Sequence, residues 1–301
     1  MNIGLRGIIY VLLAVTAVWF LWVFVRAIRA RRAEGERVAP RWPIYPIAFV
    51  ATFFDTLGVG NFATTTTAVR WLKLVPDEHL PGTLNVGYVV STITQAFIFI
   101  TVVPVGATTL VSLIVASVLG AWLGAGIVCK WPKQRLQLGM GVALLVAATI
   151  FLLSQPQIKL LPVGGDALQL TGIKLIAGIA GNFALGALMT LGIGLYGPCM
   201  ILVYLLGMTP AAAFPIMMGS CAFLMPVASA QFIKERKFDV AAVVGMSLMG
   251  IPAVLLAVKF FQSLSIVEVR WLVIVVVTIA AIGLLKAGLS RQAPPAGPKS
   301  N

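Results

Sequence analysis

Leu57-Gly58-Val59-Gly60-Asn61 interrupts the apolar run that begins at Ile44. Two glycines this close together break a helix, because glycine loses more conformational freedom than other residues when a helix forms. The helix-like stretch that follows, Phe62 to Val75, has about 14 residues, whereas a helix needs about 20 apolar residues to cross a membrane. The sequence therefore predicts a broken hairpin that enters the membrane and returns to the same side.

The composition places most of the chain in a membrane. Of its 301 residues, 60% are hydrophobic and only 10% are charged, which is too little charge for the surface of a soluble protein. The net charge of +13 does not indicate nucleic acid as a partner, because the basic residues lie in short stretches between apolar runs. The three cysteines and the single histidine, His79, have no metal-like spacing, so no metal and no cofactor are expected.

A second break resembles the first. A shift of the chain by 134 positions superposes Gly58 on Gly192 and Gly60 on Gly194, and it also aligns prolines 76 and 81 with prolines 210 and 215. Because these residues interrupt regular structure, their coincidence indicates a duplication. Each half then contains one broken hairpin and three spans, an odd number of crossings, so the halves are predicted to be inverted relative to each other.

The expected fold is therefore an all-α polytopic membrane protein with two inverted repeats, each a re-entrant hairpin plus three transmembrane helices, preceded by one extra N-terminal helix. The segments are the N-terminal helix with a basic cytoplasmic linker (1–43), repeat 1 (44–153), an extracytoplasmic linker (154–172), repeat 2 (173–287) and a flexible cytoplasmic tail (288–301). The N-terminus is expected outside the cytoplasm and the C-terminus inside it.

The distribution of charge favours this topology. It places most of the 22 Lys and Arg residues on the cytoplasmic side, as the positive-inside rule requires. If both arms of each hairpin crossed the membrane instead, the cluster of Lys130, Lys133 and Arg135 would lie outside. The run Leu175 to Leu191 is nevertheless long enough for a full span, so that alternative stays open.

The two breaks predict an anion site. A short helix is expected to begin after each break, near Asn61 and near Pro198, and each start offers free N–H groups and about half a positive charge. Non-helical backbone at membrane depth must line a cavity or be packed in protein, so two converging helix starts can bind an anion without a buried Lys or Arg. The candidate substrate-binding residues are Gly58, Gly60, Asn61, Phe62, Ala63, Thr64, Thr65, Asn85, Gly192, Gly194, Tyr196, Gly197, Pro198, Cys199 and Ser220.

Other interpretations of these residues stay open. The glycines can instead serve close helix packing, and the threonines can bond carbonyls of their own helix. Asp55 is the only acid well inside an apolar segment, which makes it a candidate proton carrier or cation ligand. It can instead lie near a membrane surface or bond the Gly-rich turn, and Met189 stands at its matching position in the second half.

Three stretches resemble the sulfite exporter TauE/SafE family of bacterial membrane permeases. They begin at Asp55 (DTLGVGNFA), Pro81 (PGTLNV) and Gly192 (GIGLYGPCM), and the resemblance covers about residues 44–287. It implies an inner-membrane carrier for small sulfur-containing or carboxylated anions such as sulfite, organosulfonates or sulfoacetate. Family members commonly have three glycines where this chain has Asn61-Phe62-Ala63 and Leu195-Tyr196-Gly197, a departure that affects the expected substrate more than the fold.

The predicted function is thus secondary transport of a small anion, with export favoured. The alternatives are an importer coupled to H⁺ or Na⁺ through Asp55 and an anion channel. An intramembrane enzyme is disfavoured, because this chain has neither a membrane Ser-His pair nor two membrane aspartates. The expected partners are the anion and the lipid bilayer, a homodimer is left open, and no nucleic acid is expected.

Overall fold

The computed structural model describes residues 3–128, 133–153, 155, 165–189 and 194–289. Within these ranges the fold is helical, and its one isolated β-bridge joins Ala167 and Met208. In chain order the elements are α1 (Ile3–Ala33), α2 (Ile44–Thr56), α3 (Phe62–Trp71), η1 (Asp77–His79), α4 (Leu80–Val102), α5 (Ala107–Val128), α6 (Lys133–Leu153), α7 (Gly172–Met189), α8 (Tyr196–Leu205), η2 (Pro210–Ala212), α9 (Ala213–Lys234), α10 (Val240–Ser263) and α11 (Ile266–Leu289).

The two halves contain the same series of elements. Helices α3 and α8 begin at positions 62 and 196 and end at positions 71 and 205, which are equivalent under the 134-residue shift. The C-terminal end of each helix is also equivalent, because Lys73 and Gly207 both have a positive φ, of 50° and 90°. The left-handed residue lets the next N–H reach back to a carbonyl in the last turn, over 3.0 Å in the first half and 3.2 Å in the second.

The lengths of the helices separate spans from broken segments. Seven helices in the described part of the chain are long and apolar enough to cross a membrane: α1, α4, α6, α7, α9, α10 and α11. Helices α2, α3 and α8 have 13, 10 and 10 residues, so each is about 20 Å long or less, against a hydrocarbon core of about 30 Å. The predicted breaks are therefore confirmed, and α7, with 18 residues, is the one hairpin arm that reaches spanning length.

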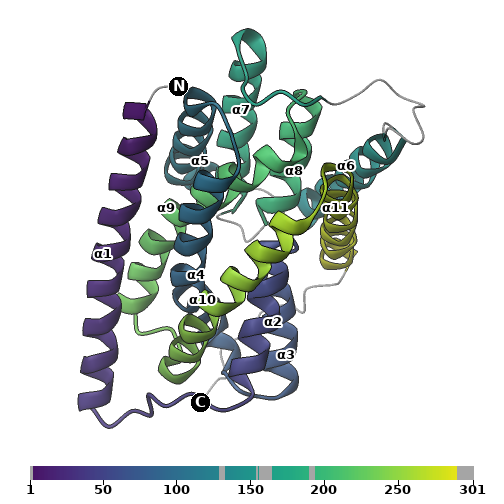
Figure 1. Ribbon diagram of the computed structural model, residues 1–301. Coiled ribbons are helices and arrows are strands. Elements are labelled where there is room, and N and C mark those ends of the chain that lie inside the picture. Colours follow the sequence, from purple (N-terminus) through teal and green to yellow (C-terminus); the bar gives the residue numbers. More distant parts are fainter. Residues whose placement is uncertain (1–2, 129–132, 154, 156–164, 190–193, 290–301) are drawn as a thin grey trace.

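The halves interlock. Helix α5 of the first half packs mainly against α7 of the second, and α10 of the second packs against α2 of the first, while α4 pairs with α9 and α6 with α11. In Figure 1 the hairpin of α2 and α3 lies in the lower half of the view, and α7 and α8 lie in the upper half. Inverted repeats would have this arrangement, but their orientation in a membrane stays a prediction.

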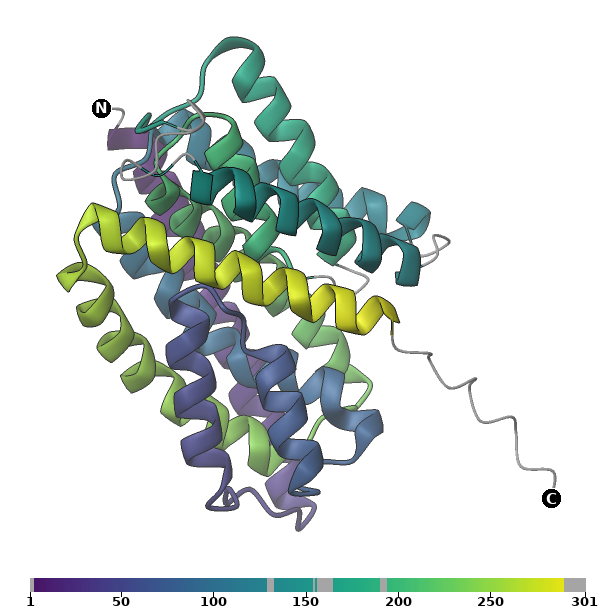
Figure 2. The same cartoon turned by 90° about the vertical axis from the view of Figure 1, so that its right-hand side faces the viewer.

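Helix α11, in yellow, runs diagonally across the molecule in Figure 2, with α2 and α3 below it. It pairs with α6 and also contacts α8. The pair of α6 and α11 therefore lies on the second hairpin, and this placement decides which short helix is covered.

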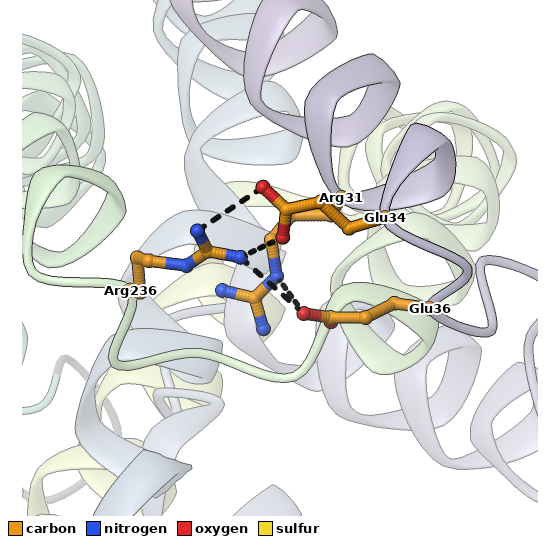
Figure 3. A network of polar contacts seen from close by, with 4 residues as sticks. All are labelled: Arg31, Glu34, Glu36 and Arg236. Carbon is orange, nitrogen blue, oxygen red and sulfur yellow. Dashed lines mark hydrogen bonds and ion pairs between the residues drawn. The ribbon is translucent and has the colours of Figure 1, made fainter.

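Helix α1 lies at the edge of the molecule against α9, α4 and α5. Ionic contacts attach its C-terminal end to the turn between α9 and α10 (Figure 3). There Arg236 pairs with Glu34 and approaches Glu36 to 3.6 Å, while Arg31 pairs with Glu36 at 2.5 Å. These contacts join the N-terminal helix to the second half of the chain.

Candidate functional site

The first break depends on two glycines whose φ angles other residues rarely adopt. Gly58 has φ +103° and Gly60 has φ +84°, both in the left-handed region. A Cβ at Gly58 would lie 2.3 Å from Cε of Met200 in α8 and 3.3 Å from Cγ1 of Val276 in α11. A Cβ at Gly60 would meet nothing within 4 Å. The first glycine therefore serves close packing, and the second faces open space.

The second break is described in part. Gly192 lies outside the described residues, which resume at Gly194. A Cβ at Gly194 would meet nothing within 4 Å, as at the equivalent Gly60. Pro198 is the third residue of α8, in the first turn, where a missing N–H costs no helical hydrogen bond. The predicted helix starts near Asn61 and Pro198 are therefore confirmed.

The buried carboxylate of Asp55 is held at the end of α2. Gln95 of α4 donates through Nε2 to Asp55 Oδ2 over 2.9 Å and to Thr56 Oγ1 over 2.8 Å. Thr56 in turn donates its own hydroxyl hydrogen to the Thr52 carbonyl. The backbone of Asn61, just before α3, also interacts with the carboxylate. Asp55 is only 3% exposed, and in the described part of the chain it forms no ion pair.

The turn after α2 also lies against the second break. A Cβ at Gly58 would lie 2.3 Å from Cε of Met200 in α8, and Val276, 3.3 Å from the same position, belongs to α11, which itself contacts α8. This places the end of α2 beside α8. The two helix starts that were predicted from the sequence therefore lie in one region of the molecule.

Several predicted residues bond within this region. Thr65 and Tyr88 share a buried hydrogen bond of 2.6 Å between their hydroxyl oxygens, and the ring of Phe62 stacks on Tyr88 at 6.5 Å between centroids. Thr64 donates to the carbonyl of Asn61 over 2.9 Å. Thr65 thus ties α3 to α4, whereas the hydroxyl hydrogen of Thr64 is used within its own first turn.

Two other predicted residues have structural partners, and a third is buried. Asn85 donates to the carbonyl of Pro81 over 2.9 Å, and Ser220 donates to that of Ile216 over 2.8 Å. Each is the carbonyl four residues earlier in the same helix, the local bond that competes with ligand binding. Cys199 is fully buried in α8 and has a free thiol.

Tyr88 is not among the site residues predicted from the sequence. It lies on α4 in a polar stripe with Asn85, Thr92 and Gln95, at spacings of three and four residues. Such spacing places side chains on one face of a helix. This polar periodicity is the feature of the sequence from which Tyr88 could have been predicted as a site residue.

The two short helices differ in how they are covered. A Cβ at Gly197 in α8 would lie 2.9 Å from Ala280 of α11 and 3.5 Å from Leu144 of α6. Helix α3 buries only Thr65 and Val69. An open groove of about 480 Å³ runs along its outer face, lined by Ala63, Thr64, Thr67, Ala68 and Trp71.

The model of the family described as sulfite exporter TauE/SafE matches residues 2–151. No curated protein and no solved structure matches. The match begins before α1, so this helix lies inside the matched region, although the resemblance noted in the sequence began only at about residue 44. It ends within α6 and contains the whole first break with its Asp55 network. The chain belongs to the sulfite exporter TauE/SafE family.

Proposed function

We propose that this multi-pass membrane protein is a permease that exports a small sulfur-containing or organic anion, of the sulfite, sulfonate or sulfoacetate kind, across the bacterial inner membrane. The family supports a permease, and the geometry around the two breaks supports an anionic substrate. The N-terminus would lie outside the cytoplasm and the C-terminus inside it, which puts the basic end of α1 at the cytoplasmic surface.

The observation that carries the proposal is the open space at Gly194, just before the start of α8. The first residues of α8, Tyr196 and Gly197, have N–H groups without helical partners, and the helix dipole adds a partial positive charge there. No acidic side chain occupies the position equivalent to Asp55, which is Met189. The start of α3, in contrast, already has the Asp55 carboxylate beside it. We therefore propose that the substrate anion binds nearer to the start of α8.

The membrane potential favours export as the direction of transport. In a cell that is negative inside, one anionic charge that moves outward gains about 2.3 kcal/mol per 100 mV. Export of a free anion therefore needs no coupling ion. Import would need a co-transported cation, and the burial of Asp55 without an ion pair in the described chain favours such coupling as the second candidate.

The test measures binding of ligands to the purified protein in detergent through the rise in its thermal unfolding temperature. The panel contains sulfite, sulfate, sulfoacetate, taurine, small carboxylates and neutral analogues. A substrate at 100 times its Kd would stabilise the fold by about 2.7 kcal/mol. Gly194→Leu, which fills the space beside the start of α8, is expected to abolish this response.

The matched control is Gly283→Leu on α11, where a Cβ would also meet nothing within 4 Å. It lies outside the proposed site and should leave the response intact. An unchanged response in a folded Gly194→Leu protein, or no response of the wild type to any anion, would refute the proposed site.

A further inference from the structure

We infer that the exposed face at the C-terminal end of α1 binds the phosphate headgroups of anionic lipids through Arg26, Arg29 and Arg32, called here the outer arginines. All three residues are exposed. Helix α1 lies at the edge of the molecule (Figure 1), so this face points away from the other helices. The inference does not depend on the transported anion, because neither break contributes to this face.

The outer arginines continue a stripe of exposed apolar side chains along α1. The members of the stripe recur every three or four residues, which places them on one side of a helix. Each of them is more than half exposed: Ile8, Val11, Val15, Val18 and Trp22. Arg26 follows Trp22 by four residues, and the other two arginines follow at intervals of three. A large exposed apolar surface marks contact with the membrane, so the arginines lie where the lipid-facing side of α1 ends.

The length of α1 places the outer arginines at the depth of the lipid headgroups. The uncharged part of the helix, residues 8–25, is about 27 Å long, close to the thickness of a hydrocarbon core, which is about 30 Å. The whole helix has 31 residues, so its length of about 46 Å matches a bilayer with its headgroups, about 40–45 Å. The segment from Arg26 to Arg32 therefore crosses the headgroup layer.

The acidic residues at this end of α1 already pair with other arginines (Figure 3). Arg31, whose side chain is only 12% exposed, pairs with Glu36 at 2.5 Å, and Arg236 pairs with Glu34. The outer arginines form no ion pair with any residue in the described part of the chain. Three positive charges thus stay without an acidic partner on the outer face. Basic clusters next to a spanning helix attract anionic lipids in this way.

Arg26 shows how such a headgroup can be bound. Its guanidinium carbon lies 5.5 Å from the centre of the Trp22 ring. Stacking uses the face of the guanidinium group and leaves its N–H groups, which lie in the plane, free to bind two oxygens of one phosphate. The tryptophan ring itself prefers the headgroup level. A lipid can contact both the arginine and the apolar stripe, whereas free phosphate can contact only the arginine.

The experiment measures thermal unfolding of the full chain in dodecyl maltoside micelles that contain dioleoylphosphatidylglycerol or dioleoylphosphatidylcholine. We expect the anionic lipid to raise the unfolding temperature more than the zwitterionic lipid does, and the difference to shrink as NaCl is added. Arg26→Gln with Arg29→Gln should weaken binding of the anionic lipid about thirtyfold, since each arginine near an anionic surface contributes about fivefold. Arg26→Lys with Arg29→Lys keeps both charges and should keep most of the response.

The matched control is Lys174→Gln with Lys259→Gln, which removes the same charge from exposed positions on α7 and α10 and should respond as the wild type does. If the glutamine variant of α1 does not fold, hydrogen exchange of the wild type decides, because the anionic lipid alone should slow exchange in the last turns of α1. The inference is overturned if both lipids act equally, if inorganic phosphate gives the whole effect, if the glutamine variant of α1 responds as the wild type does, if the control loses the response equally, or if exchange at the end of α1 does not change.

Discussion

Alanine substitutions at Gly58 and Gly60 are expected to have different effects, although the two glycines are two residues apart in one turn. Both have a positive φ, so a Cβ costs about 1–2 kcal/mol at either position because of backbone strain. At Gly60 nothing else is expected, because a Cβ there meets open space. At Gly58 the Cβ would lie 2.3 Å from Cε of Met200. Overpacking of this kind adds about 1–3 kcal/mol.

Gly58→Ala should therefore destabilise the protein by about 2–5 kcal/mol and Gly60→Ala by about 1–2 kcal/mol. The assay is the free energy of unfolding in mixed detergent micelles. Because the clash is with the end of a flexible side chain, Met200→Ala should remove most of the extra cost when it is combined with Gly58→Ala. Equal costs for the two alanine variants, or a cost for Gly58→Ala that Met200→Ala does not reduce, would refute the packing of the first break against α8.

Two further predictions concern polar contacts. Thr65→Val leaves the buried hydroxyl of Tyr88 without its partner, so it should cost about 1–3 kcal/mol of unfolding free energy, whereas adding Tyr88→Phe should recover most of this loss; additive costs would contradict the pairing. The hydrogen bond from Arg236 lowers the pKa of Glu34, so this contact is fully formed above the ordinary glutamate value of about 4.3 and is lost as the pH falls below it. Hydrogen exchange at the C-terminal end of α1 should accordingly quicken in acid, after correction for the intrinsic rate, and Glu34→Gln should show the faster exchange already at pH 7.

The sequence predicted those features of the site that depend on local backbone. Helix α3 begins at Phe62 and α8 at Tyr196, as the glycine and proline positions indicate. These residues act through their own φ angles and missing N–H groups, so their effect does not depend on distant contacts. Helices α4 and α5 are likewise separated at a segment that contains Pro104 and Gly106.

The side-chain network could not be predicted in this way. Gln95 meets Asp55 only because α4 packs beside α2, and Tyr88 meets Thr65 only because α3 folds back onto α4. Such pairings depend on the tertiary arrangement of elements that are far apart in the sequence. The polar spacing along α4 indicates a face, but the partner of that face is a property of the fold.

The duplication also could not predict the asymmetry between α3 and α8. The two halves match in element order, yet α6 and α11 cover α8 and leave α3 exposed. The contact of Gly197 with Ala280 is equivalent, under the 134-residue shift, to a contact of Ala63 with Val146. Both of these residues are exposed here, Val146 by 54%. If α6 and α11 moved from α8 to α3, they would cover the first hairpin and uncover the second. Inverted repeats give alternating access by such an exchange between two equivalent arrangements.

If α6 and α11 move between α8 and α3, pairs of cysteines should detect the movement by cross-linking in membranes during transport. Ala63→Cys with Val146→Cys should form a disulfide, because the alternative arrangement brings the two Cβ atoms within the range of about 3.5–4.5 Å that a disulfide needs. Gly197→Cys with Ala280→Cys should form one without substrate once α8 and α11 move slightly apart, because their Cβ positions lie only 2.9 Å from each other in this arrangement, and each cross-link should stop transport until it is reduced. A transporting protein in which the first pair never cross-links would show that α6 and α11 stay on α8, and access to the proposed anion site would then have to come from the hairpins themselves.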